Sequence, residues 1–143
     1  MSIGVKLNGV PQAKSRVKNL SKASLAQVAG GVNKAAAIVL GGAKADCPVD
    51  TGLLRSSIHM TPANTSGSRV SAEVGTNVEY APYVEFGTGS RGGYPYETKT
   101  KLTYSKSVKG QAAQPFLGKS LHDNKDTVKA IVSGALNGAI QNV

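Results

Sequence analysis

The sequence predicts an α+β fold: a small antiparallel sheet packed against a long N-terminal helix and a C-terminal helix, with a long projecting loop or hairpin. Three observations predict this class. Apolar residues recur at helical spacing over residues 20–45 and again over residues 119–141. Between them, residues 55–76 alternate with a period of two on either side of a polar turn. Residues 87–114 show no sustained period, which is typical of a projecting segment.

Both predicted helices carry small residues along one face. In the first, the pairs Gly30-Gly31 and Gly41-Gly42 are separated by about three helical turns, so they share nearly one face. In the second, Ala130, Gly134 and Gly138 are spaced by four and form a stripe. We expect the helices to pack through these stripes, within one subunit or between neighbours. The alternative is that the glycines are tolerated on a solvated face.

The remaining segments are short. Residues 1–12 alternate apolar and polar side chains, which predicts a strand or an extended arm. Within the hairpin predicted at 55–76, Asn64 to Ser68 supply the polar turn. Residues 78–86 are expected to form a short aromatic helix. With 143 residues in all, we expect these segments to form a single domain spanning residues 1–143, around one modest core.

Charge and cysteine content narrow the function classes. Seventeen Lys and Arg against eight Asp and Glu give a formal charge of +9, which favours a polyanionic or acidic partner. The N-terminus lacks a signal-peptide pattern and no window approaches an uninterrupted membrane span, so we expect a soluble protein made in the cytoplasm. Cys47 is the only cysteine, which excludes an internal disulfide and a Cys-rich zinc site. We expect a buried, unreactive thiol.

No residue pattern indicates catalysis. His59 and His122 are far apart in the sequence and neither lies in a metal-ligand spacing. The glycine-rich residues 87–90 lack the Gly-Lys-Ser/Thr ending that binds phosphates. Asp46 and Asp50 flank a proline that ends the first helix, where a turn and a cap explain both carboxylates. We therefore predict no enzymatic activity, no cofactor and no metal.

Three short segments are more informative than the composition. They are Cys47–Ile58 (CPVDTGLLRSSI), Val74–Gly89 (VGTNVEYAPYVEFGTG) and Gln114–Leu117 (QPFL). In this order and at these separations they resemble the phage tail-component family whose type member is the tenth gene product of a lambdoid siphophage. The resemblance covers about residues 20–140, although the segment 88–114 has no matching motif.

The resemblance implies the same α+β fold and a role in tail completion or head-to-tail joining. Members of the family are thought to form rings, commonly hexameric, that cap the tail tube beneath the connector. The implied partners are further copies of the chain, a tail-tube or tail-terminator protein and the head-tail connector proteins, with no membrane. The implied location is the tail or neck of the virion, where a passing contact with genomic DNA is left open.

The second segment supplies a candidate subunit contact. Tyr80, Tyr83 and Phe86 fall at i, i+3 and i+6 on one side of the predicted short helix, and aromatic anchors beside charge are typical of interfaces. The alternative is that these aromatics complete the core. An ion pair of Arg55 with Glu79 or Glu85, within the subunit or across the ring, would fix register while contributing only about 0–1 kcal/mol. The candidate interface residues are Arg55, Glu79, Tyr80, Tyr83, Glu85, Phe86, Pro115 and Phe116.

Cations in the long loop form a second candidate surface. These are Arg91, Lys99, Lys101, Lys106 and Lys109. They suit an acidic partner ring or DNA phosphates, and a solvated loop is the alternative. The leading hypothesis is thus a structural virion protein. The alternative function is a basic nucleic-acid-binding module, in which this loop acts with the N-terminal cluster Lys14, Arg16, Lys18 and Lys22.

Overall fold

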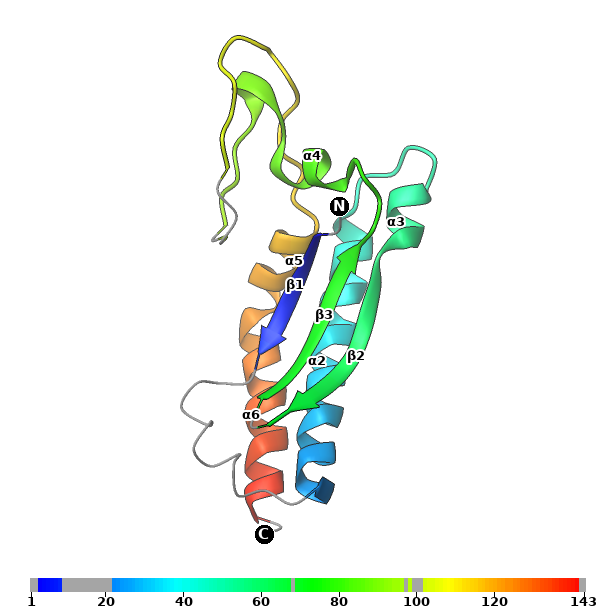
Figure 1. Cartoon of the computed structure of the whole chain (residues 1–143), viewed down its shortest axis with the longest axis vertical. Coiled ribbons are helices and arrows are strands. Elements are labelled where there is room, and N and C mark those ends of the chain that lie inside the picture. Colours follow the sequence, from blue (N-terminus) through cyan, green and yellow to red (C-terminus); the bar gives the residue numbers. More distant parts are fainter. Residues whose placement is uncertain (1–2, 9–21, 68, 97, 99–101, 142–143) are drawn as a thin grey trace.

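The computed structural model describes residues 3–8 (backbone only), 22–67, 69–96, 98 and 102–141, and the predicted α+β class is confirmed. Figure 1 shows a sheet lying against two long helices, with a projecting segment at one end. The elements in chain order are β1 (Ile3–Asn8), α2 (Lys22–Asp46), α3 (Leu53–Ser57), β2 (His59–Ser66), β3 (Arg69–Thr76), α4 (Ala81–Phe86), the 3-10 helix η2 (Gly89–Arg91), α5 (Leu117–Asp123) and α6 (Lys125–Gln141).

The sheet has three antiparallel strands in the order β1-β3-β2, so β3 is central. Val70, Ala72 and Val74 of β3 are buried, whereas Arg69 and Glu73 are exposed on the opposite face. This alternation places the apolar face of the sheet against α2. For residues 1–12 the sequence predicted either a strand or an extended arm, and residues 3–8 form the strand β1.

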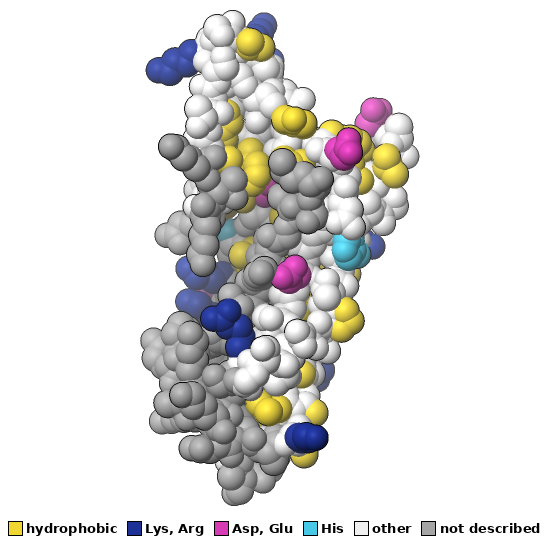
Figure 2. All heavy atoms as spheres, in the orientation of Figure 1, with side chains coloured by type: hydrophobic (Ala, Val, Ile, Leu, Met, Phe, Trp, Pro, Cys, Tyr) yellow, Lys and Arg dark blue, Asp and Glu magenta, His cyan; other side chains and the backbone are white. Residues whose placement is uncertain are grey.

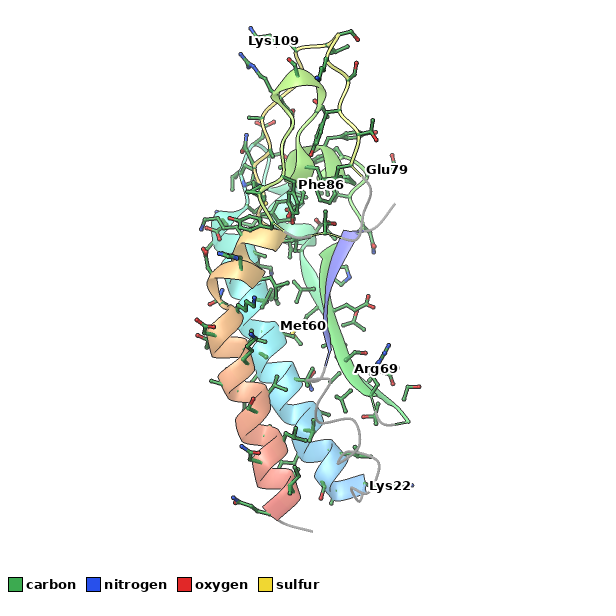
Figure 3. The ribbon with its side chains drawn as sticks, turned by 90° about the vertical axis from the view of Figure 1, so that its left-hand side faces the viewer. Lys22, Met60, Arg69, Glu79, Phe86 and Lys109 are labelled. Carbon is green, nitrogen blue, oxygen red and sulfur yellow. The ribbon has the colours of Figure 1, made fainter. Side chains whose placement is uncertain are left out.

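Helix α2 lies between the sheet and α6 (Figure 3). Its buried residues include Val28, Val32, Val39 and Ala43, which contribute to the core together with the inward face of β3. By length and composition alone, α2 is also apolar enough to cross a membrane. The sheet covers one side of α2 and α6 the other, and the buried residues of α2 belong to the core.

Only one glycine of each pair in α2 packs against another helix. Gly31 lies against Ala135 of α6, and a Cβ at Gly31 would collide with the Ala135 side chain. Gly42 lies against Ser120 of α5 in the same way. Gly30 and Gly41 have open space beside them. The predicted close approach of the helices is therefore present within one chain, through one glycine of each pair.

Within one chain, the small-residue stripe predicted on the C-terminal helix meets α2 at only one of its three positions. Ala130 and Gly134 are exposed, and Gly138 lies beside the Gln27 side chain. Instead, Ala135 faces α2, and Val132 is buried. A row spaced by four rotates about 40° per step around a helix, whereas residues spaced by three and four in alternation stay on one face.

Two predicted boundaries also need correction. The predicted hairpin begins at His59 and not at residue 55, because residues 53–57 form α3, where the Ser57 hydroxyl donates to the Leu54 carbonyl at 2.6 Å. Strand β2 includes Asn64, Thr65 and Ser66, which were expected in the polar turn, and the chain turns at Gly67, which adopts a φ of 58°. The predicted C-terminal helix starts at Leu117 and is interrupted at Asn124, whose side-chain amide donates to the Ser120 carbonyl at 2.8 Å.

Candidate assembly surface

The three sequence segments meet at one end of the molecule, where α3, α4 and the N-terminus of α5 lie (Figure 1). The hydroxyls of Ser57, in the first segment, and Thr76, in the second, share a hydrogen bond of 2.6 Å. The backbone N–H of Gln114, in the third segment, donates to the Val84 carbonyl of the second at 2.8 Å. We call this part of the molecule the arm end.

Glu85 is the central residue of the arm end. It is 1% exposed, and its carboxylate accepts four hydrogen bonds. Oε2 accepts the backbone N–H groups of Phe116 at 2.9 Å and Leu117 at 3.0 Å. Oε1 accepts the N–H of Gly118 at 2.8 Å and the hydroxyl of Tyr94 at 2.9 Å. These N–H groups belong to the free N-terminal turn of α5, where a carboxylate makes strong, charge-assisted bonds.

This arrangement corrects two of the candidate interface residues. Glu85 and Phe116 are both buried within the chain, at 1% and 0% exposure, so neither is available to a neighbouring subunit. Both instead hold α4 against α5. Pro115, which precedes Phe116, is half-buried. A lone glutamate between apolar and aromatic neighbours was the sequence signal for a buried carboxylate, but three of its four donors are more than thirty residues away.

The predicted long loop is an ordered arm, which we define as residues 87–115, with 97 and 99–101 outside the described residues. The N–H of Thr88 donates to Gln111 O at 2.9 Å, and the N–H of Ser90 donates to Val108 O at 2.7 Å. Gly110, with a φ of 63°, lies so close to the Thr88 carbonyl that no side chain fits. The two halves of the arm are therefore held together by backbone contacts.

Aromatic rings fill the base of the arm. Phe86 is half-buried and packs edge-to-face on Tyr94, with ring centroids 4.8 Å apart. The hydroxyl of Tyr104 donates to the Phe86 carbonyl at 2.8 Å. Burial, together with the adjacent Glu85 carboxylate, raises the pKa of Tyr94 above its ordinary value of 10.0. The phenol is consequently held in its neutral, hydrogen-donating form.

The other predicted aromatics point outward. Tyr83 on α4 is 60% exposed, and Tyr80, which precedes α4, is 42% exposed. Val49 and Leu53, beside and on α3, are exposed by 54% and 55% and were not predicted. Figure 2 shows hydrophobic side chains on the surface at this end. The adjacent Leu53 and Leu54 were the available signal, because a short helix can bury only one of two neighbours.

The two charged candidates nearby are also on the surface. Arg55 and Glu79 are exposed. Among the described residues, Arg55 forms no ion pair with Glu79 or Glu85, so the expected pair within the subunit is absent there. Cys47 is buried, as expected, and burial raises the pKa of its thiol, with Arg55 opposing and Glu85 adding to the shift. A neutral thiol is a weak nucleophile.

Some of the basic candidate residues are exposed on the arm, and others lie outside the described residues. Arg91, Lys106 and Lys109 are exposed on the arm, and Lys109 lies at its far end in Figure 3. Lys99 and Lys101 lie outside the described residues, as do Lys14, Arg16 and Lys18 of the N-terminal cluster, whereas Lys22 is exposed at the start of α2. Within the described part of the chain, no group of three or more His, Cys, Asp or Glu is arranged to hold a metal ion.

A comparison with protein families identifies the relationship. The family model described as "Bacteriophage HK97-gp10, putative tail-component" matches residues 12–87, just over half of the chain. The chain belongs to this HK97-gp10-like family. The matched range is narrower than the 20–140 expected from the motifs, and the third segment and nearly all of the arm lie outside it. No curated protein and no solved structure matches the chain.

Membership of the HK97-gp10-like family has direct consequences. The family is one of phage tail components, so the chain is assigned to the phage virion, where it contacts other virion proteins. The first two sequence segments fall within the matched range except for Thr88 and Gly89, and they carry the exposed residues of α3 and α4. The arm is joined to this shared part through Glu85 and is the part of the molecule that the family match leaves undescribed.

Proposed function

We propose that the chain is a tail-completion or head-to-tail joining subunit that closes into a ring, expected to contain six copies, at the neck or the top of the tail. Membership of a tail-component family supports the general role. The single observation that supports the specific role, as a subunit of a ring, is the exposure of Tyr83 on a helix that Glu85 fixes in place.

That observation favours a subunit contact for a physical reason. Helix α4 has only six residues, yet it is anchored on its inner side by the four hydrogen bonds of Glu85. Its outer side presents Tyr83, and Tyr80 lies just before it. Aromatic side chains on a rigid element lose little conformational freedom on binding and are the residue type enriched at interface hot spots.

The mechanism that follows is geometric. In a ring, each subunit would place its α3 and α4 surface against a neighbour, with Arg55 and Glu79 available for a charge contact between copies. One face of the ring would contact the tail-tube or tail-terminator protein and the other the head-tail connector. Assembly then ends the tube and prepares docking of the head without any chemical turnover.

The test is the mass of the purified protein across a concentration series, by light scattering after gel filtration in moderate salt. We expect a discrete ring for the native protein and a monomer for Tyr83→Ser. Val108→Ser is the matched control, because Val108 is equally exposed but lies on the arm. A ring that survives Tyr83→Ser would refute the role of α4.

A native protein that is monomeric in solution would move the same test to purified particles. If the chain is then absent from tails, the proposed function is wrong. Retention of duplex DNA by the isolated protein, falling steeply with salt, would instead support the nucleic-acid-binding alternative.

A further inference from the structure

The far end of the arm combines charge with an exposed apolar side chain. Val108 is 60% exposed, and the exposed cations Arg91, Lys106 and Lys109 lie on the same two segments of the arm. The backbone bonds Ser90 N–H to Val108 O and Arg91 N–H to Lys109 O, at 2.7 and 3.2 Å, hold these two segments side by side. We call these four residues the arm tip.

The shape of the arm tip is fixed before any partner binds. The Ser90 hydroxyl adds a bond to Lys109 O at 3.3 Å, and Gly89 packs so closely on the Val108 carbonyl that no Cβ fits. At the base, the Glu85 and Tyr104 contacts fasten both halves of the arm to α4 and α5. Because the backbone is already ordered, docking of the tip costs little conformational entropy.

We propose that the arm tip docks on an acidic surface with an apolar depression on a different protein of the virion. This inference rests on the proposed function. An exposed apolar side chain with cations beside it is a combination found in small protein interfaces, where the apolar group excludes water and the charges set orientation. Val108 fills the depression, and Arg91, Lys106 and Lys109 pair with carboxylates around it.

Two other occupants fit the tip less well. DNA phosphates offer no apolar contact to Val108, which is 60% exposed beside the cations. At the arm base, the Tyr94 ring packs against Phe86 and Tyr96, and the Tyr104 ring lies against Gly92, so these two rings are already in contact with the chain itself. A second copy of this chain is a poor acidic partner, because its formal charge is +9.

The first experiment places a photo-crosslinking amino acid at Val108 in assembled phage particles, with Asn64 on the exposed strand β2 as the control position. We expect a crosslink from Val108, and not from Asn64, to an Asp- or Glu-rich peptide of a different virion protein. A crosslink to DNA, to a second copy of this chain or to a peptide without acidic residues would overturn the proposal.

Experiments on the same particles distinguish a failure of tip docking from a failure of the proposed function, on which tip docking rests. Tyr83 carries the crosslinker in a parallel preparation. Crosslinks between copies through Tyr83 with none from Val108 would overturn the docking of the tip and leave the ring intact. Absence of the chain from particles would overturn both proposals.

A charge-reversal pair provides a second readout. We expect Lys106→Glu with Lys109→Glu to lower the yield of infectious tailed particles at least about tenfold without changing the mass of the purified ring. The control is Lys125→Glu with Lys129→Glu, an equal charge change at exposed positions on α6. Equal losses from the two pairs would show that net charge alone matters and would overturn the proposal.

Discussion

Glu85 accepts the backbone N–H of Phe116 at 2.9 Å, although 31 positions separate the two residues. This bond brings together the beginning and the end of the arm, because Glu85 lies just before it and Phe116 just after it. It also supplies an acceptor to the first turn of α5, which lies on α2. One carboxylate therefore couples the shape of the arm to the helical core.

Removing this carboxylate should destabilise the whole chain. Glu85→Ala leaves the N–H groups of Phe116, Leu117 and Gly118 without their acceptor in a buried site. We expect a loss of roughly 3–5 kcal/mol in the free energy of unfolding, measured by urea denaturation. Glu79→Ala, at an exposed glutamate, should stay within about 0.5 kcal/mol of the native value. Similar losses in both variants would contradict the role given to Glu85.

The phenol of Tyr94 should make stability depend on alkaline pH. Its pKa is raised in the folded chain above 10.0, so the phenol ionises first in the unfolded chain as pH rises. The folded state then binds more protons, and the stabilisation, complete below about pH 10, is lost at higher pH. Denaturation between pH 9 and about 11.5 should show this fall, and Tyr94→Phe should reduce it. Tyr83→Phe, at an exposed phenol, should leave the fall unchanged.

The two adjacent glycines of α2 should respond to alanine with opposite signs. Gly31→Ala places a methyl group against Ala135 and forces α2 and α6 apart, which should cost roughly 1–2 kcal/mol after the gain in helix propensity. Gly30→Ala meets open space and should add roughly 0.5–1 kcal/mol. Thermal unfolding of the two variants side by side tests this. A stabilising Gly31→Ala would show that the helices are not in close contact there.

The order of the arm should depend on Gly110. Its φ of 63° and its contact with the Thr88 carbonyl exclude a side chain, so Gly110→Ala should separate the two halves of the arm. We expect faster hydrogen exchange at the amides of Thr88 and Ser90, with core amides of α2 unchanged. Gly93→Ala is the control, because nothing lies within 4 Å of its Cβ position and its φ is not positive. Unchanged exchange in Gly110→Ala would argue against a preformed arm.

The sequence by itself determined the fold class and the main order of elements, because helical and alternating apolar periods are local properties of the chain. It also marked Tyr80 and Tyr83 as interface candidates and the segment after residue 86 as a projection. Val28, Val32 and Val39, which recur at helical spacing within residues 20–45, are buried in the core. The resemblance of the motifs to tail components agrees with the family match over residues 12–87.

Only the tertiary structure decided which of these residues face inward. Glu85 and Tyr83 lie two positions apart on one short helix, yet one is 1% and the other 60% exposed. The difference arises largely from three backbone donors more than thirty residues along the chain, which a local sequence pattern cannot locate. Likewise, Gly31 and not Gly30 faces α6, because the rotation of a helix is set by the partner against which it packs and not by its own sequence.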